Sequence, residues 1–251
     1  MNDFVSPPDG ARQYTLAMRP GLGDCAPSGR IRLDALARWL QDVAYADVED
    51  AGLALSAVWV VRRNRIAVHR FPRFAERFIV RTFCSGLGRM WAERRTTIEP
   101  LDSDNGDRPG APVVDAVALW VHLDPTDWRP TPFTEAEIAA YGNHAEGRRV
   151  AARLRHPPPS PDAAECRRWT FRATECDIAD HVNNAAYWQP LEEELLARGG
   201  DEPATVDAEI EFRAPSQPGE KLVLADGDQR WITSLDRGAH ASLRVRSGWR
   251  G

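Results

Sequence analysis

Residues 175–188 read Glu175-Cys176-Asp177-Ile178-Ala179-Asp180-His181-Val182-Asn183-Asn184-Ala185-Ala186-Tyr187-Trp188. This stretch places an acid, an imidazole and two amides within the eight residues from Asp177 to Asn184. It continues into an apolar and acidic segment, 191–196, that stops at Gly199 and Gly200, a normal end for a helix. The polar cluster therefore lies just ahead of a helix, whose first backbone N–H groups have no intrahelical partner. Such a combination can hold and polarise a carbonyl.

The same residues resemble the signature of hotdog-fold thioesterases, D-x-x-x-H-V-N-N-x-x-Y leading into a helix. The wider chain is similar to the acyl-ACP thioesterases of plants and bacteria, whose second domain carries D-x-N-x-H-V-N-N. Stretches 59–63, 91–95 and 120–124 also look like that family's first domain. The resemblance implies an α+β fold of two tandem hotdog domains, each a long helix wrapped by a curled antiparallel sheet. It also implies hydrolysis of fatty acyl-ACP in fatty acid biosynthesis, with no cofactor and no metal.

Two positions depart from the family pattern. Ala179 replaces the family's asparagine, and Pro215 stands where the family has a catalytic glutamate. Single-domain hotdog thioesterases work with one carboxylate at the position of Asp177. We therefore expect activity to survive through Asp177 and His181 with a changed mechanism. An acyl-CoA thioesterase and a non-catalytic acyl-binding hotdog protein remain as alternatives.

Composition limits the class of protein. The 251 residues are enough for two domains of ordinary size, and a hydrophobic fraction of 43% is enough for a core. No apolar run has the length of a membrane span, and residues 1–8 lack the pattern of a signal peptide, so we expect a cytoplasmic protein. The net charge of −5 argues against nucleic-acid binding. The four cysteines are scattered without C-x-x-C, so neither a disulfide framework nor a metal site is indicated.

The order of predicted elements repeats. An N-terminal hotdog domain over 10–141 begins with a strand at 14–18 and an amphipathic helix that ends before Gly52. Its further predicted strands are 58–61 and 66–68 around a basic turn at 62–65, then 78–83, 90–98 and 113–123. A linker rich in proline and arginine follows at 142–165. A C-terminal hotdog domain over 166–251 then has predicted strands at 168–173, 206–212, 221–224, 229–234 and 239–246.

A sequence echo supports the duplication. Asp24-x-Ala26 lines up with Asp177-x-Ala179, which places Ser28 at the position of His181. We interpret this as a duplicated domain in which only the second copy kept the acid and the imidazole. Pro190 lies inside the second predicted helix, so either that helix is kinked, or 183–189 is a separate turn and Pro190 is the first helical residue.

The candidate catalytic residues are Asp177 and His181. Asp177 could act as general base or nucleophile, and His181 could orient water, transfer a proton or bind the thioester. Backbone N–H groups around 182–184 could polarise the carbonyl. Asn183 and Asn184 are candidates for substrate binding or for capping the helix.

The acyl chain and its carrier require two further surfaces. An apolar tunnel, which the resemblance assigns mainly to the first domain, has as candidates Trp39, Val43, Trp59 and Trp91, each of which could equally be core. Acyl carrier protein is acidic, so its docking surface should be basic. The candidates are the linker arginines or Arg62, Arg63, Arg65, Arg70, Arg73 and Arg77. A tandem already contains a hotdog pair, so we expect a monomer or a homodimer.

Overall fold

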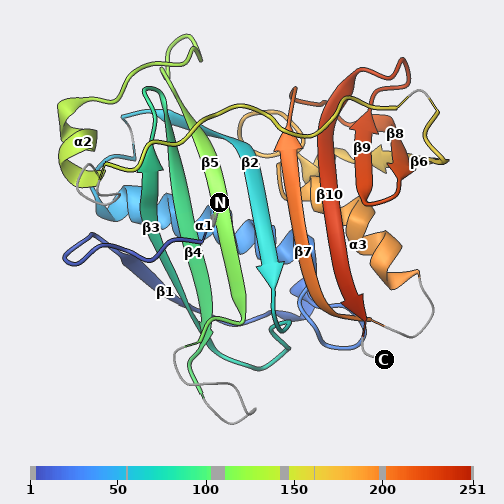
Figure 1. Ribbon diagram of the computed structural model, residues 1–251, viewed down its shortest axis with the longest axis horizontal. Coiled ribbons are helices and arrows are strands. Elements are labelled where there is room, and N and C mark those ends of the chain that lie inside the picture. The colour runs from blue at the N-terminus through green and yellow to red at the C-terminus, as the bar shows by residue number, and fades with distance from the viewer. Residues whose placement is uncertain are drawn as a thin grey trace.

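The computed structural model describes residues 4–54, 56–102, 111–141, 147–160, 162–197 and 202–249. Ten strands within these residues form one antiparallel sheet in the order β1-β3-β4-β5-β2-β7-β10-β9-β8-β6 (Figure 1). The strands of its first half are β1 (Tyr14–Met18), β2 (Val58–Val68), β3 (Phe78–Leu87), β4 (Trp91–Pro100) and β5 (Val114–Leu123). Those of its second half are β6 (Glu165–Phe171), β7 (Pro203–Phe212), β8 (Gly219–Asp226), β9 (Gln229–Thr233) and β10 (Ala239–Trp249).

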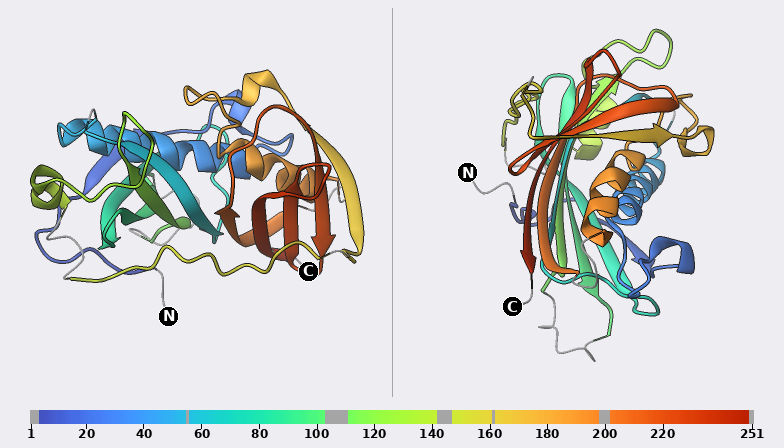
Figure 2. Two further views of the ribbon diagram at one scale, coloured as in Figure 1. Left: turned by 90° about the horizontal axis from the view of Figure 1, so that it is seen from above. Right: turned by 90° about the vertical axis from the view of Figure 1, so that its right-hand side faces the viewer.

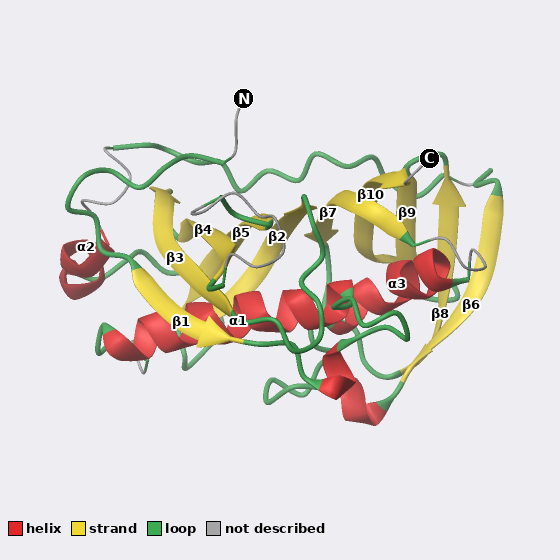
Figure 3. Cartoon of the chain, turned by 90° about the horizontal axis from the view of Figure 1, so that it is seen from below, coloured by secondary structure: helices red, strands yellow, loops and turns green. Residues whose placement is uncertain are grey.

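Two helices cover one face of this sheet. Helix α1 (Leu33–Asp50) lies against the first half and α3 (Gln189–Leu196) against the second (Figures 1 and 3). Residues 147–160, between the halves, cross the opposite face (Figure 2). A third helix, α2 (Glu135–Tyr141), was not expected from the sequence. Among the described residues, no helix is both long and apolar enough to cross a membrane.

Helix α1 forms where the apolar spacing predicts it. Leu33, Leu36, Leu40 and Val43 recur at helical spacing and are at most 4% exposed. Burying each such side chain stabilises the fold by about 1.5–3 kcal/mol. The helix ends at Asp50, before Gly52 as predicted. The buried stripe of this long helix therefore forms part of the core on one face of the sheet.

The second helix resolves the conflict over Pro190. A short 3-10 turn, η3 (Ala186–Trp188), precedes α3, and Pro190 is the second residue of that helix. There the missing N–H of proline costs no helical hydrogen bond. The alternative with a separate turn before the helix is therefore confirmed, with a start one residue earlier. Gly199 and Gly200, predicted to stop the helix, lie outside the described residues.

The prediction of a basic turn at 62–65 is wrong. These residues continue the strand, and β2 is unbroken from Val58 to Val68 apart from a bulge after Val61. The arginines are tolerated because β2 lies in the middle of the sheet beside acidic residues of β7, such as Asp207, which binds Arg65. Pairing of β2 with β7 joins the two halves.

Candidate functional site

The motif folds as a tight turn ahead of the second helix. The backbone N–H of Asp177 donates to the carbonyl of His181 at 3.0 Å, and the N–H of Asp180 donates back to Asp177 O at 3.0 Å. Asp180 has a positive φ of 58°, a conformation that aspartate tolerates better than most residues. The sequence forms this turn because short polar side chains can bond to their own backbone.

The carboxylate of Asp177 is held at both oxygens. Oδ1 accepts from the backbone N–H of Ala179 at 2.9 Å, and Oδ2 accepts from Asn183 Nδ2 at 3.0 Å. Each oxygen keeps a second lone pair for another donor. The group is therefore fixed in direction yet able to accept a proton.

Asn183 has a structural task as well. Its Oδ1 accepts from the N–H of Ala185 at 2.8 Å, in the manner of a helix cap. Its own N–H donates to Glu175 O at 2.8 Å. The amide of Asn183 thus ties the carboxylate of Asp177 to the start of the helical segment.

The backbone N–H of Asn184 remains available, unlike those of its neighbours in the chain. The N–H of Val182 donates to Ser216 O, and those of Asn183 and Ala185 are already bound. Within the described residues, neither the backbone N–H nor the side chain of Asn184 has a hydrogen-bond partner. Asn184 lies beside Asp177 in the lining of a cavity, so its N–H can polarise a carbonyl there.

His181 is placed differently from expectation. Its hydrogen bond with Asp177 joins backbone atoms and not the two side chains. The half-buried ring of His181 has no hydrogen-bond partner in the part of the chain that the structure describes. It is also not among the described residues that line the cavity. An imidazole held this loosely can move a proton but does not orient Asp177.

A cavity of about 480 Å³ extends from the motif into the first half of the chain. Its lining comes from α1, α2, the first-half strands, nearby loops and the motif. These residues are Gln41, Ala44, Tyr45, Val48, Ala54, Ala57, Val58, Trp59, Cys84, Leu87, Ala92, Glu93, Arg94, Trp120, Trp128, Phe133, Glu137, Ile138, Tyr141, Asp177, Ile178, Ala179, Asn183 and Asn184. Most of the lining is apolar, as a site for an acyl chain requires.

The exposed part of the cavity lining, called its mouth below, includes a residue adjacent to Asp177. Ile178 is fully exposed, and Tyr45, Trp128 and Ile138 are each about half exposed, so these four residues mark where the cavity meets solvent. Asp177 precedes Ile178 and is partly buried. A thioester at the mouth would therefore face Asp177, while its chain runs inward.

The charged groups of the inner wall are hydrogen-bonded to neighbours. Glu137 accepts from Ser56 Oγ at 2.7 Å and lies 2.9 Å from His122 Nε2. Arg94 donates to Asp47 at 2.7 Å. Because these groups already have partners, the inner wall offers no free charge to a ligand.

Of the four predicted tunnel residues, Trp59 alone is among the described residues that line the cavity. Trp39 and Val43 face the core instead, and the Trp39 ring lies 6.5 Å from that of Phe78. Trp91 donates from Nε1 to Val150 O at 2.8 Å, so it fastens the linker rather than the acyl site. Helical spacing identified the buried stripe of α1 but could not separate the core from the adjoining cavity face.

Two cysteines near the site have no nucleophilic character. Burial raises the pKa of Cys84, in the cavity wall, to about 11. Burial and the nearby charges of Asp180, Asp177 and Glu175 raise the pKa of Cys176. Both thiols are thus neutral near pH 7, and a thiolate mechanism is disfavoured.

The first half contains a second copy of the turn. The N–H of Ala26 donates to Arg30 O at 2.8 Å, as Asp177 donates to His181. Short 3-10 turns at 22–24 and 173–175 precede both copies. Ala26 therefore occupies the position of Asp177, and Arg30 that of His181.

The alignment expected from sequence is consequently wrong by two residues. It placed Asp24 opposite Asp177 and Ser28 opposite His181, whereas the backbone hydrogen bonds make Asp24 equivalent to Glu175. Asp24 and Glu175 each accept from a backbone N–H three residues earlier. The first copy thus lacks both candidate catalytic side chains, and residues 26–30 contain no acid.

A side chain of helix α3 binds to the turn of the first half. Glu192 is 3% exposed and accepts from Arg30 Nη2 at 2.7 Å and from the N–H of Leu33 at 3.0 Å. Leu33 is the first residue of α1, and its backbone N–H would otherwise be free for a ligand. Here that N–H donates to the carboxylate of Glu192 instead. The turn in the first half is a packed contact between the halves.

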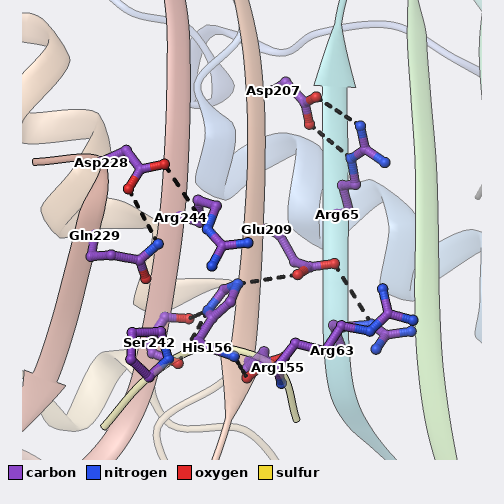
Figure 4. A network of polar contacts seen from close by, with 12 residues as sticks. Arg63, Arg65, Arg155, His156, Asp207, Glu209, Asp228, Gln229, Ser242 and Arg244 are labelled. Carbon is purple, nitrogen blue, oxygen red and sulfur yellow. Dashed lines mark hydrogen bonds and ion pairs between the residues drawn. The ribbon is translucent and has the colours of Figure 1, made fainter. Parts of the chain in front are cut away.

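A cluster of His156, Glu209 and Glu211 has the composition of a metal site. Figure 4 shows His156 and Glu209 pointing toward each other. However, Glu211 accepts from the N–H groups of Arg155 and His156 at 2.6 and 3.0 Å. His156 uses one ring nitrogen on Glu209 and the other on Ser242 O. The cluster therefore fastens the linker across the sheet, and its ligand atoms already have partners.

Most of the six arginines predicted to bind acyl carrier protein already have partners within the chain. Arg65, Arg70 and Arg77 form ion pairs with carboxylates, Arg63 is 5% exposed, and Arg62 and Arg73 donate to backbone carbonyls. The linker residues Arg149, Arg153 and Arg155 are exposed. Of the two predicted basic surfaces, the linker is the more accessible.

Comparison with known families covers most of the chain. Residues 13–141 match the model described as the acyl-ACP thioesterase N-terminal domain, and residues 160–241 match that of the C-terminal domain. An uncharacterised protein of Mycobacterium tuberculosis is 27% identical over 222 residues, covering 88% of this chain and 85% of the relative.

Solved structures share the fold at low identity. A putative oleoyl thioesterase from Lactobacillus plantarum aligns with a TM-score of 0.76 at 19% identity, over 97% of this chain and 98% of that one. An acyl-ACP thioesterase from Bacteroides thetaiotaomicron gives 0.75 at 18%, over 94% and 97%. The 12:0-ACP thioesterase from Umbellularia californica gives 0.69 at 16%, over 95% and 97%. The architecture is that of a hotdog-like thioesterase fold.

Proposed function

The chain belongs to the acyl-ACP thioesterase family, and on that premise we propose that Asp177 activates water for hydrolysis of fatty acyl-ACP to free fatty acid and ACP. The observation that carries this assignment is the position of the Asp177 carboxylate. It is held by Ala179 and Asn183 next to the mouth of a largely apolar cavity. The reactive thioester and the chain behind it would thus meet matching surfaces.

In the proposed reaction, the thioester carbonyl accepts a hydrogen bond from the N–H of Asn184. Water attacks the carbonyl carbon while Asp177 accepts its proton, and the developing negative charge on oxygen is stabilised by that N–H. The carbon–sulfur bond then breaks, and the thiolate receives a proton. We assign this last transfer to His181, whose ring has no partner within the described residues. The proton that Asp177 took from water then restores His181, which closes the cycle.

Ala179 and Pro215 change the family's machinery without removing this minimum set. Ala179 contributes its backbone N–H to Asp177, which an alanine supplies as well as an asparagine does. Pro215 offers only a carbonyl, which lies 3.0 Å from His240 Nδ1. Loss of the glutamate at that position favours the acyl-binding alternative, and an activity assay decides between the two.

The finer organisation is also part of the proposal. We assign a hotdog domain to 10–141, which supplies most of the acyl cavity, a linker to 142–165, and a catalytic hotdog domain to 166–251. We place acyl carrier protein near the exposed linker arginines Arg149 and Arg153. A cytoplasmic monomer or homodimer is expected.

The test is release of fatty acid from a panel of acyl-ACP and acyl-CoA thioesters by the wild type, Asp177→Asn and Asp9→Asn. Asp177→Asn keeps the shape of the side chain but not the base, so the rate should fall by about 10²–10⁴-fold. Asp9 is exposed and serves as the matched control.

The outcomes separate the candidate functions. Hydrolysis of acyl-ACP that is lost in Asp177→Asn supports the proposal. Hydrolysis of CoA esters alone would keep the chemistry and change the carrier. Acyl binding without turnover would establish a binding protein instead.

A further inference from the structure

The equivalence of the two turns identifies a residue opposite the catalytic motif. In the first copy, Glu192 of α3 reaches the N–H of Leu33. Counting forward from the equivalent residues Ala26 and Asp177, Leu33 corresponds to Asn184, and Gln41 of α1 corresponds to Glu192. Gln41 should therefore face the N–H of Asn184, and the two residues do line the same cavity.

Gln41 differs from Glu192 in its charge and in its hydrogen bonding. Glu192 is a buried carboxylate with two hydrogen bonds to the first turn. Gln41 is half-buried, and its amide has no hydrogen-bond partner in the part of the chain that the structure describes. A neutral amide in this position leaves the N–H of Asn184 available and adds both a donor and an acceptor.

A second observation concerns a small cavity of about 10 Å³ next to the first. Gln41, Trp120 and Asn184 line both cavities, and Asn64 and Trp188 line the small one. Its volume is close to the roughly 10–15 Å³ that one water molecule requires.

Three buried polar atoms around this small cavity have no protein partner. They are Asn64 Oδ1, Trp120 Nε1 and Trp188 Nε1. A buried polar atom without a hydrogen bond costs roughly 1–3 kcal/mol, so such atoms usually bind ordered water. One acceptor and two donors match the hydrogen-bonding capacity of a single water molecule.

We propose that Gln41 is a further catalytic residue, which holds the attacking water next to Asn184, and that the small cavity behind it is a water site. This inference rests on the proposed hydrolysis. The water oxygen bonds to the thioester carbon, Asp177 takes one proton, and the carbon–sulfur bond breaks. The leaving thiolate receives a proton from His181, and the proton on Asp177 then restores that imidazole, so acid and thiol are the products. Gln41 stays neutral throughout and supplies only hydrogen bonds.

Kinetics of Gln41→Met and Gln41→Glu test the catalytic role. Methionine keeps the length and volume but no amide, so kcat should fall about 10- to 100-fold with KM unchanged. In Gln41→Glu the new carboxylate should take the N–H of Asn184, as Glu192 takes that of Leu33, and activity should fall further. The matched control is Gln13→Met, an exposed glutamine before β1.

A crystal structure tests the water site without relying on activity. We expect ordered water within hydrogen-bond distance of Asn64 Oδ1 in the wild type and its loss or displacement in Gln41→Met. Unchanged kcat in a folded Gln41→Met, or an empty small cavity in the wild type, would overturn the inference. An inactive wild type with water bound at this site would instead refute the proposed hydrolysis.

Discussion

The substitution Asn183→Asp separates two tasks of one side chain. The new carboxylate can still accept from the N–H of Ala185, now 2.8 Å from Asn183 Oδ1, but it cannot donate to Asp177 Oδ2 at 3.0 Å. A hydrogen bond to a charged group contributes about 1.5–3 kcal/mol, so kcat/KM should fall roughly 10- to 150-fold. Two carboxyl groups sharing a site do not both ionise readily, so the acidic limb of the pH–rate profile should move to higher pH.

The companion variant Asn183→Ala removes both hydrogen bonds. Losing the cap costs about 1 kcal/mol, and for a chain of this size that lowers Tm by roughly 2–4 °C. Asn183→Asp should keep the wild-type Tm near pH 7. The assay is kcat/KM for acyl-ACP over a pH series, together with thermal unfolding of both variants. An unshifted acidic limb in Asn183→Asp would refute the assignment of Asn183 as the residue that positions Asp177.

Three further predictions concern stability and reactivity. Glu192→Ala removes the closer of two carboxylates that pair with buried Arg30 and leaves only the more exposed Glu202, so it should cost about 3–5 kcal/mol. This is read as a Tm loss of roughly 6–20 °C, and a smaller loss would mean that the contact is not buried in solution. Burial raises the pKa of Glu209, but His156 and nearby arginines outweigh it and hold the pKa below its usual 4.5. The stability that Glu209 contributes is present above that pH and is lost as pH falls through the lowered pKa, so Glu209→Gln should flatten the acid side of a urea-midpoint profile. Alkylation near pH 8 should spare buried Cys84, whose thiol stays protonated, and modify exposed Cys166, as peptide mass spectrometry would show.

Local chemistry could be predicted wherever the deciding residues are neighbours in sequence. The stripe of α1 follows from helical spacing, and the turn around Asp177 follows from its short polar residues. A helix that begins next to Pro190 was one of the two alternatives that the sequence left open.

Features that depend on distant partners could not be predicted. Arg62 and Arg63 look like a turn until β7 supplies acidic neighbours across the sheet. Gln41 looks like an ordinary residue of α1, because the motif it faces belongs to the other half of the chain. The one signal that could have identified it is an uncharged amide at the edge of an otherwise apolar stripe.

The pairing of β2 with β7 also has a consequence for synthesis. The ribosome releases the first half well before β7, and domains generally fold in that order. Until β7 arrives, β2 is an open edge that any other extended chain could join. The cavity wall is meanwhile incomplete, because Asp177 and Asn184 have not yet been placed. The nascent first half therefore lacks a complete cavity, and the hazard of its unpaired edge is greatest during this interval.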